Sequence, residues 1–253
     1  MIDTRAIVSR LQTIESVAII PRVTSTNLVA RRIVVECIEN ELSLPQAMII
    51  AREQFAGRGR NDRSWSSPAG KGIYSTTLLT RTAAELPMIP LLMATIVAGY
   101  LHESFGIDAR IKWPNDVLAG GRKIAGILIE GRTHEEKSYL LIGIGVNVEP
   151  VKDDLRPNAI SIRELAPQLV DIDEAITRFI EHVDAALSRS SSREAVLAEW
   201  LRLSIHKEGD AILCVLGDRT ISGTWSGIDI HGRALITSDG VTTAISAGDM
   251  ILA

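Results

Sequence analysis

The chain has 253 residues, of which 46% are hydrophobic and 23% are charged. This balance is typical of a globular protein, and the length allows one large domain with or without a small one. The formal net charge of -4 excludes a protein whose overall field attracts nucleic acid, so cations that bind an anion must be clustered locally. Cys37 and Cys214 lie far apart among apolar neighbours, which indicates two buried thiols in a reducing compartment, not a disulfide framework.

The N-terminus carries no signal-peptide pattern. The longest apolar run, residues 88–101, contains Pro90 and is shorter than the roughly 20 residues that span a bilayer. We therefore expect a buried helix there, no membrane association and a cytoplasmic protein.

Hydrophobic periodicity predicts strands and helices in mixed order over the first 203 residues. The expected strands, in chain order, are 17–20, 48–51, 73–79, 109–112, 123–130 and 139–148, and the expected helices are about 28–38, 89–105, 173–187 and 194–203. Glycines interrupt the last two strands, and a glycine inside a strand often marks a close approach to the backbone. A ligand lying across the sheet would require such positions.

From about residue 205 the pattern changes to short β-rich runs that alternate with turns. Four or five strands at this spacing indicate a small barrel. We place a domain boundary near Ser204, which gives a large domain over residues 1–203 and a small one over residues 204–253.

The most distinctive stretch is residues 54–65, which carries Arg58, Arg60 and Arg63, with a glycine on each side of Arg58 and Trp65 at its end. Glycine lets a ligand come near the backbone, and arginine presents a planar fork suited to carboxylate or phosphate. We expect a strand, a cationic loop that closes over an anion, and a second strand. Each charge also has a plain explanation as a solvated loop or strand-end residue, and Trp65 could simply pack.

Common chemical motifs are missing from the sequence. It has no Gly-x-x-x-x-Gly-Lys-Ser/Thr loop, no complete dinucleotide fingerprint and no Gly-x-Ser-x-Gly elbow. The five histidines are scattered without the spacing of metal ligands, so we predict no metal site in the protein itself.

Four blocks in order resemble the biotin–protein ligase family: 57–65 with Gly-Arg-Gly-Arg, 112–116 with Lys-Trp-Pro-Asn-Asp, 123–130 with Lys-Ile-Ala-Gly-Ile-Leu-Ile-Glu, and 143–147 with Gly-Ile-Gly-Val-Asn. The resemblance covers nearly the whole chain. It implies an α+β fold with a mixed β-sheet and packed helices, similar to class II aminoacyl-tRNA synthetases and biotin–lipoate ligases. A C-terminal SH3-like β-barrel would follow that catalytic domain.

The same resemblance implies an ATP-dependent ligase that forms biotinyl-5′-AMP from biotin and ATP with Mg²⁺. Biotin then passes to one lysine of a biotin carboxyl carrier protein or domain. The implied biotin site consists of Ser25, Thr26, Asn27, Gln54, Arg58, Gly59, Arg60, Lys123 and Gly126. The implied ATP site consists of Arg58, Arg60, Arg63, Trp65, Lys112, Asn115 and Asn147, and catalytic roles fall on Lys123, Arg60, Lys112 and Asp116.

Two departures from the family pattern stand out. Phe55 occupies a position that is usually polar, and we expect its ring to pack under the loop and alter the mobility of the loop. About 24 residues precede Ser25, too few for the DNA-binding domain of some members, so we expect the monofunctional form without DNA binding. The resemblance leaves a monomer or a homodimer open.

Three other functions remain in competition. A lipoate–protein ligase would share the fold and the adenylation chemistry. A non-enzymatic module would bind biotin or a nucleotide and release no pyrophosphate. A nucleic-acid binder would use the barrel and the arginines, although the acidic composition argues against it.

Overall fold

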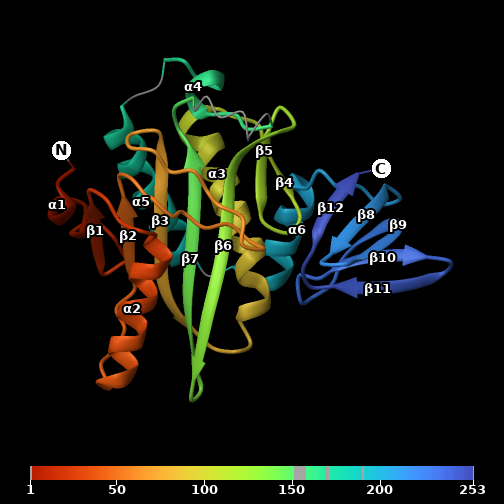
Figure 1. Cartoon of the computed structure of the whole chain (residues 1–253), viewed down its shortest axis with the longest axis horizontal. Helices are drawn as coiled ribbons and strands as arrows, with labels where there is room; N and C mark the ends of the chain where they lie inside the picture. Colours follow the sequence, from red (N-terminus) through yellow and green to blue (C-terminus); the bar gives the residue numbers. More distant parts are fainter. Residues whose placement is uncertain (1, 151–157, 169–170, 190, 253) are drawn as a thin grey trace.

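The computed structural model describes residues 2–150, 158–168, 171–189 and 191–252, and Figure 1 shows them as a large sheet beside a small one. The large sheet has seven strands in the order β1-β2-β3-β7-β6-β5-β4. Only β1 and β2 pair in parallel, so the sheet is mixed, as predicted. Its strands are β1 Ser16–Ile20, β2 Ala47–Ala51, β3 Gly72–Arg81, β4 Ala109–Lys112, β5 Asp116–Ala119, β6 Arg122–His134 and β7 Lys137–Asn147.

Helices cover both faces of this sheet. On one face α2 (Thr26–Glu39) packs Ala30 and Val34 against Ala47 and Ile49. Alternate residues of a strand point to opposite faces, so Met48 of the same strand belongs to the other core cluster. That second face carries α3 (Ile89–Phe105) and α5 (Ile172–Ser188).

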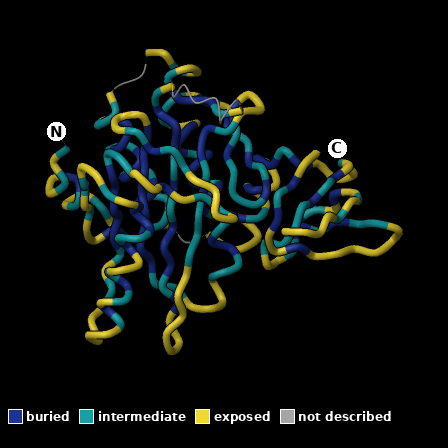
Figure 2. Tube along the Cα trace, viewed as in Figure 1, coloured by how far each residue is buried: buried dark blue, intermediate teal, exposed yellow. Residues whose placement is uncertain are grey.

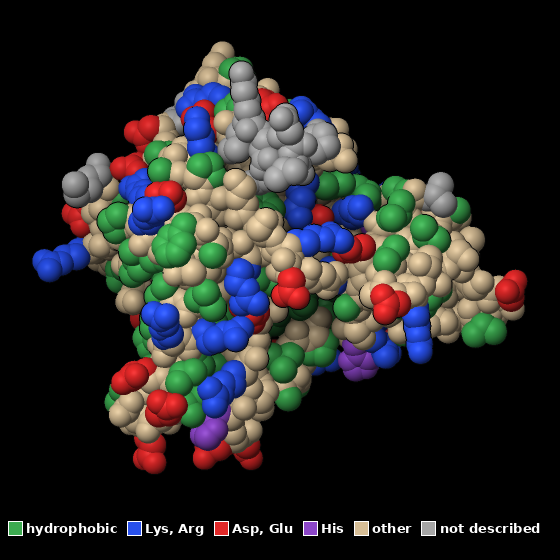
Figure 3. Space-filling view, in the orientation of Figure 1, with side chains coloured by type: hydrophobic (Ala, Val, Ile, Leu, Met, Phe, Trp, Pro, Cys, Tyr) green, Lys and Arg blue, Asp and Glu red, His purple; other side chains and the backbone are tan. Residues whose placement is uncertain are grey.

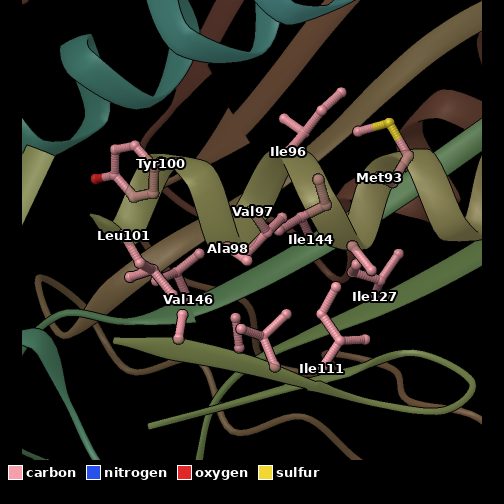
Figure 4. Close-up of a cluster of buried hydrophobic side chains, with 14 of the residues drawn as sticks. Met93, Ile96, Val97, Ala98, Tyr100, Leu101, Ile111, Ile127, Ile144 and Val146 are labelled. Carbon is pink, nitrogen blue, oxygen red and sulfur yellow. The ribbon is translucent and has the colours of Figure 1, made fainter. Parts of the chain in front are cut away.

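The core is centred on α3, whose residues pack on strand residues such as Ile127 and Ile144 (Figure 4). Figure 2 shows the dark-blue buried segments concentrated in these central elements. By length and composition alone the segment Leu86–Phe105 could cross a membrane, but more than half of it is buried inside the protein, as in a core helix. The remaining helices are α1 Thr4–Val8, η1 Leu86–Met88, α4 Ile162–Leu165 and α6 Arg193–Leu203.

The small sheet is antiparallel, with five strands in the order β11-β10-β9-β8-β12. Its strands are β8 Ala211–Leu216, β9 Arg219–Ile228, β10 Ala234–Ser238, β11 Val241–Ile245 and β12 Asp249–Leu252. It meets the large domain through stacked rings: Trp225 lies 6.5 Å from Trp200 of α6 between ring centroids, and His206 stacks on Trp225 at 4.7 Å. The α+β class with an SH3-like C-terminal domain is confirmed, while the boundary at 203/204 stays a prediction.

The sequence did not predict β5, β12, α1 or α4, each of which is five residues or shorter. Asp116, which lies between the expected strands 109–112 and 123–130, is the first residue of β5. The two short strands form because neighbouring strands pair with them, and hydrophobic periodicity cannot detect elements as short as these four.

Candidate active site

The cationic stretch folds as a tight hairpin. Gly59 N–H donates to the Arg63 carbonyl at 2.7 Å, and Trp65 N–H donates to the Gly57 carbonyl at 2.9 Å. At the tip, Asn61 and Asp62 both adopt positive φ, 52° and 55°. Two such residues in succession make the turn that suits the twist of a hairpin, and Asn and Asp tolerate this conformation better than other side chains. The local sequence therefore fixes the shape of the loop.

Beneath this hairpin, beside the N-terminus of α2, lies a small pocket floored by β6 and β7. Three residues of this floor, Gly126, Gly143 and Gly145, are glycines, because side chains from above occupy the space that a Cβ would need. A Cβ built at Gly145 would lie 2.4 Å from Trp65, and one at Gly143 would lie 2.4 Å from Oδ1 of Asn27. The close approach predicted from the strand glycines is thus present, and here it is made by protein side chains.

One wall of the pocket is a continuous hydrogen-bond network. Gln54 Oε1 accepts from the Thr26 N–H at 2.8 Å, and Gln54 Nε2 donates to Ser67 at 2.9 Å. Thr76 Oγ1 lies 2.8 Å from Thr26 Oγ1 and 2.6 Å from Asn27 Oδ1. These groups suit a neutral polar ligand that both donates and accepts hydrogen bonds.

The other end of the site is charged. Lys123 Nζ lies 2.6 Å from Asp116 Oδ1 and 5.3 Å from the centroid of the Trp65 ring, which it faces. Arg60 donates to Asn115 Oδ1 at 3.0 Å, and Asn115 donates to the Ile127 carbonyl at 2.6 Å. A fixed ammonium group therefore stands close to a carboxylate and to the polar pocket.

The arginines of the hairpin reach in different directions. Arg58 pairs with Glu130 of β6 at 3.1 Å, and Arg63 pairs with Asp249 of the small sheet. Arg60 also reaches the carbonyl of Gly248 at 3.4 Å. Figure 3 shows the wider surface around them, where Lys and Arg side chains spread over the face on which β6 and β7 lie.

The second domain helps to position the 112–116 segment. The Trp113 N–H donates to His206 Nε2 at 3.2 Å, and the Trp113 indole N–H donates to the Gly232 carbonyl at 3.2 Å. His206 is 3% exposed. Burial, aided by the charge of Lys112, lowers the pKa of His206 to about 4, so the imidazole stays neutral and can accept this hydrogen bond.

Most of the predicted residues come together around this pocket. Ser25, Thr26, Asn27, Gln54, Arg58, Trp65 and Gly126 line it, while Gly59 and Arg60 stand on the hairpin and Lys123, Asp116 and Asn115 lie at its charged end. Lys112 lies in register with Asp116 on the neighbouring strand. Asn147 is 8% exposed and donates to the Ile160 and Lys123 carbonyls, so its amide already supports the backbone.

The expectation for Phe55 was wrong. Its ring is 61% exposed and lies under the guanidinium of Arg22, 5.4 Å from the ring centroid, instead of under the loop. The loop leaves no room for it, since an added Cβ at Gly57 would already meet the Trp65 carbonyl oxygen at 2.2 Å.

Sequence reasoning missed several polar contributors, among them Thr76 and Glu130. Glu130 ends the quoted 123–130 block and follows Gly126 at the even spacing that places both on one face of the strand. That spacing was the available signal. Among the residues that the structure describes, no group of three or more His, Cys, Asp or Glu side chains could hold a metal ion.

Two family models match the chain. The biotin/lipoate A/B protein ligase family matches residues 20–147, and the biotin protein ligase C-terminal domain matches residues 212–253. The bifunctional ligase/repressor BirA of Bacillus subtilis is 31% identical over 216 residues, which are 79% of this chain and 64% of that protein. The chain thus spans less than two thirds of the length of that curated relative.

A second relative is matched over more of its length. The biotin–[acetyl-CoA-carboxylase] ligase of Paracoccus denitrificans is 32% identical over 228 residues, which are 81% of this chain and 89% of that enzyme. Among solved structures, the biotin protein ligase of Aquifex aeolicus in complex with biotin and ATP superposes with a TM-score of 0.73. At 24% identity, covering 94% of this chain and 98% of that one, this likeness supports the fold.

Proposed function

Because the chain belongs to the biotin/lipoate A/B protein ligase family, we propose that it is an ATP-dependent biotin–protein ligase. In this proposal it forms biotinyl-5′-AMP and transfers biotin to a lysine of a biotin carboxyl carrier protein or domain. The observation that carries the proposal is the Lys123 ammonium, held 2.6 Å from Asp116 at the charged end of a pocket whose other end is neutral and polar.

The first step joins two anions. A biotin carboxylate oxygen forms a bond to the α-phosphorus of ATP, and the bond to the β-phosphate oxygen breaks as pyrophosphate leaves. Fixed cations offset the repulsion and stabilise the charge that develops. Lys123 would hold the carboxylate and then the acyl-phosphate, while Arg60, Arg63 and Lys112 would contact the phosphates. Asn115, Asn147 and Trp65 would face the nucleotide.

We propose that Mg²⁺ enters with ATP. No cluster of acidic or histidine side chains for a resident metal lies among the described residues, and Mg²⁺ is commonly bound through substrate phosphates with one or two carboxylates. Its charge would neutralise the departing pyrophosphate.

The second step transfers the acyl group. The target lysine's neutral amine forms a bond to the acyl carbon, the bond from that carbon to the phosphate oxygen breaks, and AMP leaves. Asp116 would accept the amine's proton once Lys123 turns toward the phosphate. The hairpin would exclude water from the reactive anhydride.

The test is to incubate the protein with biotin, Mg-ATP and an apo carrier domain, and to look for the added mass of one biotin. Lys123→Ala should lose biotin-dependent pyrophosphate release while keeping its thermal unfolding temperature. Arg60→Gly should let the adenylate escape and label other lysines. Release at the wild-type rate from Lys123→Ala would remove that residue from the chemistry.

Lipoate is the substrate to exclude. Thermal shifts with biotin and with lipoate, each with Mg-ATP, separate the two ligases, and stronger stabilisation by lipoate would overturn the choice of biotin. We also propose a cytoplasmic protein, which the two free buried cysteines, Cys37 and Cys214, support.

A further inference from the structure

We propose that Glu130 is a positioning residue that sets both the orientation of the Asn27 amide and the closed position of Arg58. This inference rests on the proposed biotin site and assigns a role to a carboxylate that the mechanism above does not use. Glu130 lies on β6, on the same face as Gly126 and opposite Leu141 in the β6–β7 register. Its side chain is 18% exposed.

Three donors from two segments converge on this carboxylate. Asn27 Nδ2 donates to Oε2 at 2.9 Å, while Arg31 and Arg58 donate to Oε1 at 2.5 Å and 3.1 Å. Asn27 and Arg31 lie on α2, and Arg58 lies on the hairpin, so Glu130 joins the helix, the sheet and the loop. When the hairpin opens, Arg31 remains to pair with the charge, so opening does not leave a half-buried carboxylate uncompensated.

The carboxylate also determines which way the Asn27 amide points. An ionised carboxylate only accepts, so the NH₂ group of Asn27 must face it. Oδ1 then faces Thr76 and accepts from the Thr76 hydroxyl at 2.6 Å. A flipped amide would place an oxygen against the carboxylate and lose that donor. Glu130 therefore orders the donors and acceptors along the network that continues to Thr26 and Gln54.

The second effect concerns the loop. Arg58 lines the pocket and pairs with Glu130, so this pair ties the first arm of the hairpin to the sheet. If Glu130 loses its charge, the arm loses its partner on β6, and the hairpin should open more often. An adenylate beneath it would then meet water before it meets the target lysine.

The test uses Glu130→Gln, which keeps the size and removes the charge. Glu181→Gln is the matched control, because Glu181 also pairs with an arginine, Arg10, at 2.7 Å, but on the surface of α5. We expect Glu130→Gln to raise the Kd for biotin about tenfold, the loss typical of one charge-assisted hydrogen bond. Pyrophosphate released per biotin transferred should also rise, a ratio that a purely structural role would leave unchanged.

A double variant separates the two effects. If Glu130 retains the adenylate through Arg58, the double variant Arg58→Gln/Glu130→Gln should release no more pyrophosphate per biotin transferred than the single variant with the higher ratio. Wild-type values for Kd and for the ratio in Glu130→Gln would overturn the proposal. If the wild-type protein itself binds no biotin, the proposed function fails and this inference fails with it.

Discussion

Gly145 offers the sharpest test of the geometry beneath the hairpin. It lies in β7 opposite Gly126 of β6, and the Trp65 indole rests on it. In Gly145→Ala the new Cβ would lie 2.4 Å from Cε2, 2.5 Å from Nε1 and 2.8 Å from Cζ2 of that indole. Either the strand or the ring must move.

The ring should move, because β7 is hydrogen-bonded on both sides, to β3 and to β6. Overpacking by one methyl group in a tight contact costs about 1–3 kcal/mol. If the hairpin alone takes up this cost, the equilibrium constant between its closed and open states shifts toward the open state by roughly 5- to 150-fold. Alanine in place of a strand glycine also gains about 0.5–1 kcal/mol in backbone entropy, so the global stability should change little.

The assay is biotin-dependent pyrophosphate release, compared with the unfolding free energy from urea titration. Gly131→Ala is the matched control on β6, because its Cβ would meet Leu140 Cδ2 at an ordinary 3.4 Å. We expect Gly145→Ala to lose at least fivefold in rate, within the range above, with an unfolding free energy near that of the control. A wild-type rate, or a loss of stability that accounts for the loss of rate, would refute the reasoning.

Three further predictions concern residues outside the pocket. Asp184→Ala should lower the unfolding free energy by about 3 kcal/mol or more, because the buried Asp184 carboxylate accepts hydrogen bonds from the N–H groups of residues 12–14 at 2.7–2.8 Å. Urea titration measures this loss, and a loss below about 1 kcal/mol would contradict the prediction. In the folded protein the pKa of His206 is lowered from 6.5 to about 4, so the unfolded chain binds a proton on this residue more readily. The neutral imidazole therefore contributes its full stabilisation above pH 6.5, and this stabilisation is lost as the pH falls toward 4. Between about pH 7.5 and pH 5 the loss should be about 2 kcal/mol, and His206→Gln should show a shallower dependence; equal slopes would exclude this residue as the cause. Phe55→Gln should change neither the biotin affinity nor, by more than about 1 kcal/mol, the stability, because the exposed ring lies under the guanidinium of Arg22. A changed biotin affinity would show that the ring does act on the loop.

Much of the fold follows from local patterns. Alternation and helical periodicity predict the long strands and helices because burial repeats along each element. The glycines of β6 and β7 correctly indicated a close approach to the backbone. What approaches them, the Trp65 ring and the Asn27 amide, depends on chain segments far away in the sequence.

The interactions around Glu130 lie beyond sequence reasoning for the same cause. Asn27 and Glu130 are separated by 103 positions, and Arg63 and Asp249 by 186. No spacing rule connects such pairs, because the packing of α2 on the sheet and of the hairpin against the small domain brings them together. The prediction for Phe55 failed for a related reason, because Trp65 occupies the space beneath the loop.

The hairpin's three arginines connect it to both domains: Arg58 pairs with Glu130 of β6, Arg63 pairs with Asp249 of the small sheet, and Arg60 reaches Asn115 and Gly248. The Arg63 side chain is 68% exposed and that of Arg58 is 37% exposed, so both pairs are screened, and exposed pairs contribute at most about 1 kcal/mol each. Closure therefore rests on several weak contacts that can be released in turn, as exchange of substrate and product requires. Of the two carboxylate partners, Glu130 at 18% exposure is more sheltered than Asp249 at 31%, so the Arg58–Glu130 pair should outlast the Arg63–Asp249 pair as the hairpin opens.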